Sequence, residues 1–262
     1  MKTDMNGCDN SPLLAYEAAL EQLTRGIGPS GGVIDTPLRQ ALGAVLAKSI
    51  DAEIDVPGCA MSAMDGYAIN TTDLAASGPT SLTLSQRIPA GTFGEPLAPG
   101  TAARIFTGAP VPDGADAVIM QEQVESDDHQ VSFDIHPTVG CNIRPAGNDI
   151  QRGTTVLSAG RRLRAQDIGL AASVGMQTLP VYAPIRVGMF LTGDELVEPG
   201  EMLAAGKIYD SNRYTLHGLL ESMGCKIVDL GLVGDTLAAT CEAMTRASTE
   251  ADLVVTTGGV SV

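Results

Sequence analysis

The 262-residue sequence has no tryptophan, and only 3% of its residues are aromatic. Proteins that bind single-stranded nucleic acid stack bases on aromatic side chains, so this composition disfavours that class. Basic residues are also scarce: 16 Lys and Arg stand against 31 Asp and Glu, which gives a formal net charge of −15. This charge repels a polyanion at long range. We therefore expect no nucleic-acid partner, and we expect any anionic ligand to be held through a divalent cation or backbone N–H groups.

Long apolar runs and paired cysteines are absent as well. No apolar run approaches the roughly 18 residues of a membrane span. The N-terminus carries an early acid, Asp4, and lacks the apolar segment of a secretory signal. The five cysteines are odd in number and widely spaced, without a Cys-x-x-Cys pair, which argues against a disulfide framework and a zinc site. These absences predict a soluble, cytoplasmic protein that does not bind a membrane.

Two segments near the N-terminus carry helix signals. Ser11-Pro12 supplies an N-cap and a proline at the first helical position, and an apolar stripe follows until Gly26. Thr36-Pro37 repeats this start, and the apolar residues among 38–46 predict a second helix that runs to Lys48.

The residue pattern then changes, first after residue 50 and again after residue 142. Residues 51–142 contain short β-leaning runs, such as 81–84 and 131–135, separated by clusters of Gly, Pro, Asp and Ser, which predict a small all-β insert. A helical pattern follows Ala165 and ends at Gly175. From Tyr182 onward, predicted strands and helices alternate in the order βαβαβ, which is typical of a doubly wound parallel sheet. The predicted strands are 186–191, 226–233 and 252–257, and the predicted helices are 210–223 and 236–248.

Ligands of open α/β sheets bind beyond the carboxyl ends of the strands. The three strand exits read Thr192-Gly193-Asp194-Glu195, Gly234-Asp235 and Thr256-Thr257-Gly258-Gly259-Val260-Ser261. Glycines 258 and 259 allow backbone amides to approach a phosphate, while Glu195 and Asp235 offer hard oxygen ligands to Mg²⁺. Each exit alone is more often an ordinary helix cap or turn than a functional site. Their coincidence at one sheet edge favours a binding site.

One further segment, 57–68, crowds small residues around a single carboxylate, Asp65, ahead of a β run. A tight Asp-Gly turn that starts a strand is the alternative explanation. Ser62-Ala63-Met64-Asp65-Gly66-Tyr67-Ala68 nevertheless resembles a signature of the MoeA/gephyrin family, and four more motifs resemble that family in the family's order. They are 104–112 (RIFTGAPVP) with 114–118 (GADAV), 144–149 (RPAGND), 192–196 (TGDEL) and 257–262 (TGGVSV).

This resemblance implies a multidomain, elongated α/β protein with a β-rich insert, which forms a homodimer with a site shared by both protomers. Residues 1–26 would form a helix packed near the α/β domain. Residues 27–52 and 143–180 would form a linking domain, and 53–142 the small all-β domain. Residues 181–262 would form a MogA/MoaB-like, doubly wound molybdopterin-binding domain that is incomplete at its C-terminus.

The resemblance also implies an activity: insertion of molybdate into adenylylated molybdopterin with release of AMP, by a molybdopterin molybdenumtransferase that uses Mg²⁺. The molybdopterin adenylyltransferase is a further expected partner. Matching motif positions give two sets of residues. The carboxylates expected to be catalytic are Asp65, Asp149, Glu195 and Asp235, of which Glu195 and Asp235 are expected to hold metal. The expected substrate contacts are Thr107, Thr192, Gly193, Thr257, Gly258, Gly259 and Ser261.

The family pattern continues past the final Gly-Gly-Val-Ser-Val loop, whereas this sequence stops at Val262. A phosphate loop without the helix that follows it lacks N-terminal amides for the anion, so we expect a truncated chain of reduced activity. Two alternatives remain. A non-catalytic molybdopterin-binding or scaffold module fits a truncated chain, while molybdopterin adenylylation is disfavoured because that sister family lacks the insert.

Overall fold

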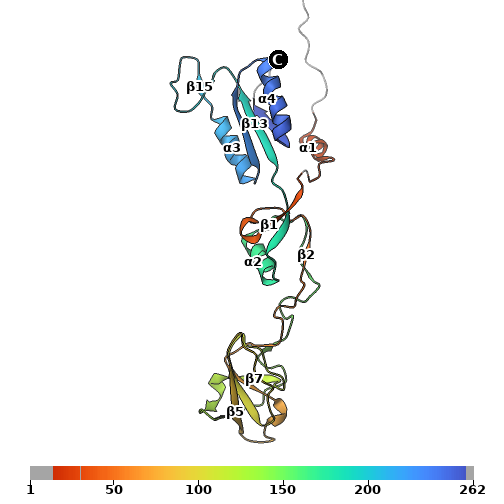
Figure 1. The fold of residues 1–262 in the computed structure, drawn as a ribbon, viewed down its shortest axis with the longest axis vertical. Helices are drawn as coiled ribbons and strands as arrows, with labels where there is room; N and C mark the ends of the chain where they lie inside the picture. Colours follow the sequence, from red (N-terminus) through yellow and green to blue (C-terminus); the bar gives the residue numbers. More distant parts are fainter. Residues whose placement is uncertain (1–13, 30, 258–262) are drawn as a thin grey trace, which may run out of the picture. The chain divides into compact units, whose positions relative to one another are not determined.

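The computed structural model describes residues 14–29 and 31–257 (Figure 1). The chain divides into two compact units, Met1–Ile34 with Tyr182–Val262, and Asp35–Val181. We call them the α/β unit and the β unit. The predicted combination of a parallel α/β sheet with a β-rich insert is confirmed, while the finer four-part division stays a prediction. In the described part of the chain, no helix combines the length and apolar character that a membrane span needs.

The α/β unit is built around β13 (Arg186–Thr192), which pairs in parallel with β16 (Lys226–Val233) on one side and β17 (Leu253–Thr257) on the other. Helix α3 (Asn212–Ser222) connects β13 to β16, and α4 (Leu237–Glu250) connects β16 to β17. The two connections cross the sheet in opposite directions, so right-handed crossovers place the helices on opposite faces. Figure 1 shows α3 and α4 on either side of β13. The predicted βαβαβ order is confirmed.

The packing of α4 on this sheet depends on small residues. A Cβ at Gly188 of β13 would lie 3.1 Å from the Cβ of Ala247, so glycine is what allows the helix to approach. Ala243 and Ala247 are the buried residues of α4, and β13 is buried from Val187 to Leu191. A short parallel pair, β14 (Leu196–Val197) and β15 (Ile208–Tyr209), completes the connection before α3.

The predicted N-terminal helix is present as α1 (Tyr16–Thr24). Its predicted start at Ser11-Pro12 lies outside the described residues. Gly26 follows the helix at φ 81°, as expected of a terminating glycine. None of the α1 residues is buried, so its apolar stripe faces solvent within this chain.

The β unit contains a six-stranded sheet in the order β7-β4-β6-β5-β9-β8. Tyr67 and Ile69 of β4 belong to one buried cluster and Ala68 to another, because successive strand residues face opposite sides. The sheet therefore has a core on each face. Its strands are β4 (Gly66–Ile69), β5 (Thr80–Ile88), β6 (Thr101–Ile105), β7 (Ala117–Met120), β8 (Glu125–Ser126) and β9 (Gln130–Phe133), with short helices η2 (Thr71–Asp73) and η3 (Gln121–Gln123).

A separate core of this unit gathers Leu46, Leu157, Leu163 and Leu179. Helix α2 (Ala165–Ser173), which confirms the predicted helix after Ala165, packs here. The unit also contains three two-stranded pairings, β1 with β12, β2 with β11 and β3 with β10, and β2, β11 and β12 contribute buried residues to this core. These strands are β1 (Val33–Pro37), β2 (Ile50–Asp51), β3 (Met61–Ser62), β10 (Ile143–Arg144), β11 (Thr155–Leu157) and β12 (Thr178–Tyr182).

The prediction of a helix from Thr36 to Lys48 is wrong. Thr36 and Pro37 end β1, and only a single 3-10 turn, η1 (Leu38–Gln40), follows. The backbone bonds of this segment go elsewhere: Leu46 N donates to Arg161 O at 2.9 Å and Ala47 N to Pro180 O at 2.8 Å. Leu46 is fully buried while Leu42 is 64% exposed. Long-range pairing with residues 161–180 therefore replaces the local helical bonds that the apolar spacing suggested.

Candidate functional site

The three predicted strand exits of the α/β unit lie next to one another. In the parallel register, Leu191 is opposite Thr257, and Thr192 is opposite Val233. The Thr192 hydroxyl lies 3.5 Å from the Thr257 carbonyl oxygen as a long hydrogen bond. The prediction that these exits share one sheet edge is confirmed for the described residues. Gly258, Gly259 and Ser261 lie outside them.

Gly193 leaves room for the Glu195 carboxylate. It adopts φ 153°, and a Cβ at this position would meet the two Glu195 carboxylate oxygens at 2.8 and 2.9 Å. Leu196 N closes the turn by donating to Gly193 O at 3.1 Å. The glutamate therefore folds back against the backbone at the end of β13, and a side chain in place of glycine would push it away.

The backbone of Asp235 is tied to the first exit through a residue that sequence reasoning did not select. Asp235 N donates a long, 3.4 Å hydrogen bond to Oδ1 of Asp194. The N-cap of α4 is Thr236, whose hydroxyl accepts from Ala239 N at 3.3 Å. The Asp235 carboxylate is exposed and makes no hydrogen bond with a described residue, so helix capping does not explain it. The position of Asp194, between Gly193 and Glu195 in the same motif, was the available signal.

Asp65 of the β unit is held by Thr107. The backbone N–H and the hydroxyl of Thr107 both donate to Asp65 Oδ1 at 2.8 Å. These two bonds, the backbone one first, lower the pKa of the Asp65 carboxyl, and the charge of Arg104 contributes in the same direction. Asp65 Oδ2 makes no hydrogen bond with a described residue. Sequence reasoning placed both residues in the site, and the structure brings them into direct contact.

The turn explanation of Asp65-Gly66 has a structural basis as well. A Cβ at Gly66 would lie 1.9 Å from the backbone oxygen of Ile119, because β4 is squeezed between β6 and β7 at this point. Arg104 lies beside the same turn, where its Nη1 donates to Gly66 O at 3.1 Å and its Nη2 contacts Gln121 Oε1. Gly66 is thus structural, whereas Asp65 has an oxygen left for a ligand.

Asp149 lies in a different setting of the β unit. It pairs with Arg144, and Asn148 Nδ2 donates to its Oδ1 at 2.9 Å. The bond from Arg144, followed by the bond from Asn148, lowers the pKa of Asp149. No hydrogen bond joins Asp149 to Asp65 in this fully described unit. Asp149 lines an open hollow of about 440 Å³ with Gly147, Asn148, Ile150, Gln151, Thr154, Thr155, Val156 and Leu170.

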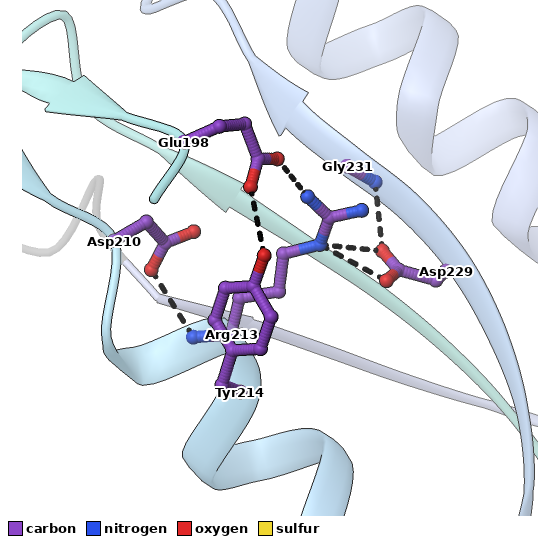
Figure 2. A network of polar contacts seen from close by, with 6 residues as sticks. All are labelled: Glu198, Asp210, Arg213, Tyr214, Asp229 and Gly231. Carbon is purple, nitrogen blue, oxygen red and sulfur yellow. Dashed lines mark hydrogen bonds and ion pairs between the residues drawn. The ribbon is translucent and has the colours of Figure 1, made fainter. Parts of the chain in front are cut away.

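A polar network at the start of α3 was predicted only in part (Figure 2). The segment Asp210-Ser211-Asn212 is the expected helix cap, and within it Asp210 Oδ1 accepts from Arg213 N at 3.1 Å, whereas the Ser211 side chain makes no capping bond. Arg213 pairs with Glu198 and with Asp229, whose Oδ2 lies 2.9 Å from Nε. Asp229 precedes an irregularity in β16 and also accepts from a backbone N–H, that of Gly231, at 2.9 Å. The network joins α3 to β16.

Potential metal ligands are dispersed in the described chain. Over residues 14–29 and 31–257, no three or more His, Cys, Asp or Glu side chains gather in a way that could hold a metal ion. Among the described residues, no third His, Cys, Asp or Glu side chain therefore forms a metal-binding group with Glu195 and Asp235.

Comparison with known proteins gives consistent matches along the chain. Residues 14–175 match the family described as MoeA N-terminal region (domain I and II), and residues 188–262 match a probable molybdopterin binding domain. The chain is 43% identical over 229 residues to molybdopterin molybdenumtransferase of Haemophilus influenzae, covering 86% of this chain and 56% of that protein. It is 39% identical over 250 residues to molybdopterin molybdenumtransferase 2 of Mycobacterium tuberculosis, covering 94% and 61%.

A solved structure agrees with these matches. The molybdopterin biosynthesis moeA protein of Pyrococcus horikoshii OT3 superposes with a TM-score of 0.87 at 34% identity, over 95% of this chain and 68% of that one. The chain thus spans 56% to 61% of the length of the two curated relatives.

Proposed function

We propose, from the premise that this chain belongs to the MoeA family, that it acts in molybdenum cofactor biosynthesis as a molybdopterin molybdenumtransferase. In this reaction the dithiolene sulfurs of adenylylated molybdopterin replace two oxo ligands of molybdate, which leave as water with the two thiol protons and two protons from solvent. A further water cleaves the phosphoanhydride bond, and AMP leaves. The observation that carries the proposal is the continuous similarity through both the β unit and the parallel sheet. An adenylyltransferase built on the parallel sheet alone needs no β unit.

The two sets of carboxylates support different steps. Asp65 and Asp149 have lowered pKa values, owing to Thr107 and to Arg144 respectively, and are ionised at neutral pH. We assign them to the orientation of molybdate and the leaving adenylate through hydrogen bonds and charge. Thr192, Gly193 and Thr257 lie at the adjoining strand exits, where with Gly258, Gly259 and Ser261 we assign them to the pterin phosphate.

Mg²⁺ is part of the proposal, with Glu195 and Asp235 as its protein ligands. Their carboxylates are hard donors, and Mg²⁺ is commonly held by one or two carboxylates together with water and substrate phosphates. Both carboxylates are exposed and make no hydrogen bond with a described residue, and Asp235 N donates to Asp194, the neighbour of Glu195, which supports their availability to one cation. When bound, the ion would screen the negative charges of protein and ligand from each other.

The proposal extends to partners and location. We infer a homodimer that receives its pterin from the molybdopterin adenylyltransferase, in the cytoplasm. The cysteines in the described part of the chain, Cys59, Cys141, Cys225 and Cys241, are free thiols, which fits a reducing compartment.

AMP release tests the function. The chain is incubated with adenylylated molybdopterin, molybdate and Mg²⁺, and AMP is quantified by chromatography. We expect molybdate-dependent AMP release that the Asp65→Asn variant lowers at least tenfold, since asparagine can still accept the bonds of Thr107 but lacks the charge. Arg39→Gln, an exposed change outside the site, should retain wild-type release. Pterin binding without any AMP release would instead establish the non-catalytic binding module.

A further inference from the structure

The cations of the β-rich segment are few and lie together. Residues 53–142 contain 12 Asp and Glu but only two basic residues of the Lys/Arg type, Arg87 and Arg104. Both guanidinium groups lie over the ring of Phe106, at 4.4 and 4.7 Å from its centroid. Arg87 of β5 and Arg104 of β6 are cross-strand partners, and Phe106 follows Arg104 by two residues, which places it on the same face. Strand register therefore brings both cations of this segment to one ring.

This arrangement is electrostatically unfavourable without an anion. Like charges directly opposite on neighbouring strands destabilise a sheet. Because both distances are measured to one centroid, the two guanidinium groups lie within about one Debye length of each other, roughly 10 Å at 0.1 M salt. Neither arginine forms an ion pair in the β unit, all of which the structure describes. Twelve carboxylates in the same segment were available as partners, yet the two cations lie beside an aromatic ring.

The two arginines differ in how they are held. Arg104 is half-buried, donates to Gly66 O and Gln121 Oε1, and also lies over the Tyr67 ring at 5.0 Å. Arg87 is exposed, and its contact with Phe106 is the interaction that orients it. A guanidinium stacked on a ring keeps its in-plane N–H donors available for a ligand. Arg87 therefore presents donors outward while Arg104 supplies fixed charge.

The arginine pair adjoins the site residues of the β unit. Phe106 is followed directly by Thr107, whose N–H and hydroxyl bind Asp65. Arg104 donates to the carbonyl of Gly66, the residue after Asp65. Two positive charges therefore lie beside the Asp65 carboxylate, whereas the carboxylate of Glu122 is linked to Arg104 only through the side chain of Gln121.

We propose that Arg87 and Arg104, oriented by Phe106, form a binding site for a tetrahedral oxyanion beside Asp65. The ligand class is a phosphate monoester or a molybdate-type dianion, whose oxygens accept the forked donors of a guanidinium. The assignment of this ligand to the catalytic cycle rests on the proposed function, because molybdate is a substrate of that reaction and AMP, a phosphate monoester, is its product. Binding itself does not depend on turnover.

Amide NMR titration of the ¹⁵N-labelled chain tests the site. Inorganic phosphate, AMP and molybdate are added in separate experiments at constant ionic strength, and the signals of Phe106, Thr107 and Gln121 are followed. We expect saturable shifts, and we expect Arg87→Gln to weaken the affinity about tenfold or more, as the loss of a charge-assisted hydrogen bond does. Arg87→Lys should bind with intermediate affinity because it keeps the charge but loses the fork.

Arg39→Gln is the matched control, since it removes one exposed positive charge from the same unit away from Phe106. Absence of saturable shifts with all three anions, or equal affinities of Arg87→Gln and Arg39→Gln, would overturn the site. A preference for molybdate supports a site for the metal oxyanion, and a preference for AMP supports a site for the adenylate. If the chain shows the anion-dependent NMR shifts but releases no AMP, the proposed function is refuted and the arginine site stands. If it releases AMP but shows no such shifts, the arginine site is refuted and the proposed function stands.

Discussion

The two units hold their candidate carboxylates in opposite ways. In the β unit, Asp65 accepts two hydrogen bonds from Thr107 and Asp149 pairs with Arg144, and both pKa values are lowered. In the α/β unit, the carboxylates of Glu195 and Asp235 are exposed and make no hydrogen bond with a described residue. The first pair is fixed by side chains before a ligand arrives, whereas the second is positioned only through the backbone.

This difference suggests a division of labour. A fixed, ionised carboxylate offers a defined acceptor to a ligand at no cost in reorganisation. An exposed carboxylate near a phosphate-binding loop repels its ligand unless a cation lies between them. The β unit is thus expected to act without metal, while the α/β unit is expected to depend on it.

The largest expected effect contrasts a glycine in each unit. Gly66→Ala places a Cβ 1.9 Å from the backbone oxygen of Ile119, and the paired strands cannot move aside, so we expect a loss of at least about 3 kcal/mol of stability. Gly218→Ala in α3 meets no atom within 4 Å and should stabilise the chain by about 0.5–1 kcal/mol. Urea denaturation followed by circular dichroism measures the unfolding free energy of both variants. Hydrogen exchange of the β4 amides then shows whether the loss in Gly66→Ala lies in the β unit. Equal stabilities would show that β4 is not tightly enclosed.

The next effect concerns acid sensitivity. The bond from Arg161 lowers the pKa of the Asp167 side chain from 3.8 to about 2, assisted by bonds from Arg164. A depressed folded-state pKa contributes stability that is fully present above 3.8 and is lost as the pH falls through about 2. Asp167→Asn should therefore lower the urea midpoint strongly at pH 7, and the difference from wild type should shrink below pH 3.8.

Asp252 of the α/β unit is the control for this titration. Arg186 also lowers its pKa, but the pair is more exposed, with 30% of the Asp252 side chain accessible against 3% for Asp167. Solvent screens such a pair, so Asp252→Asn should shift the midpoint less. A larger shift for Asp252→Asn would contradict the greater importance of the buried carboxylate.

The smallest expected effect is the dependence of ligand affinity on Mg²⁺, which we expect to involve carboxylates of the α/β unit and not those of the β unit. Calorimetric titration with adenylylated molybdopterin should give about tenfold weaker binding without Mg²⁺, or ~1.4 kcal/mol. Asp235→Asn should reduce this dependence because one of the repelling charges is gone. Asp65→Asn should leave the ratio of affinities with and without Mg²⁺ unchanged. A metal-independent affinity of the wild type, or a ratio altered only by Asp65→Asn, would reverse the proposed division.

Sequence patterns predicted the parallel sheet well because its elements depend on local periodicity. The strand at 226–233 has the predicted position, and the helix predicted at 236–248 is present as Leu237–Glu250, since the apolar spacing that marks both acts within a few positions of the chain. The helix expected at 36–48 failed because the bonding partners of that segment, 161–180, lie more than a hundred residues away. The apolar spacing of residues 38–46 carries no information on their pairing with residues 161–180.

In the candidate site, too, local patterns were predictable from the sequence and long-range contacts were not. The motifs by themselves selected Asp65, Thr107, Asp149, Glu195 and Asp235, because acids, hydroxyls and glycines cluster at turns where ligands bind. Contact between Asp65 and Thr107, 42 residues apart, required the pairing of β4 with β6. The meeting of Arg87 and Arg104 on Phe106 required the register of β5 against β6. The sequence alone determined the element types, the charge and the family motifs, since these depend on residue identity and short spacing. Only the tertiary structure decided which carboxylates are held and which are free, because hydrogen bonds between distant segments depend on how the strands pair.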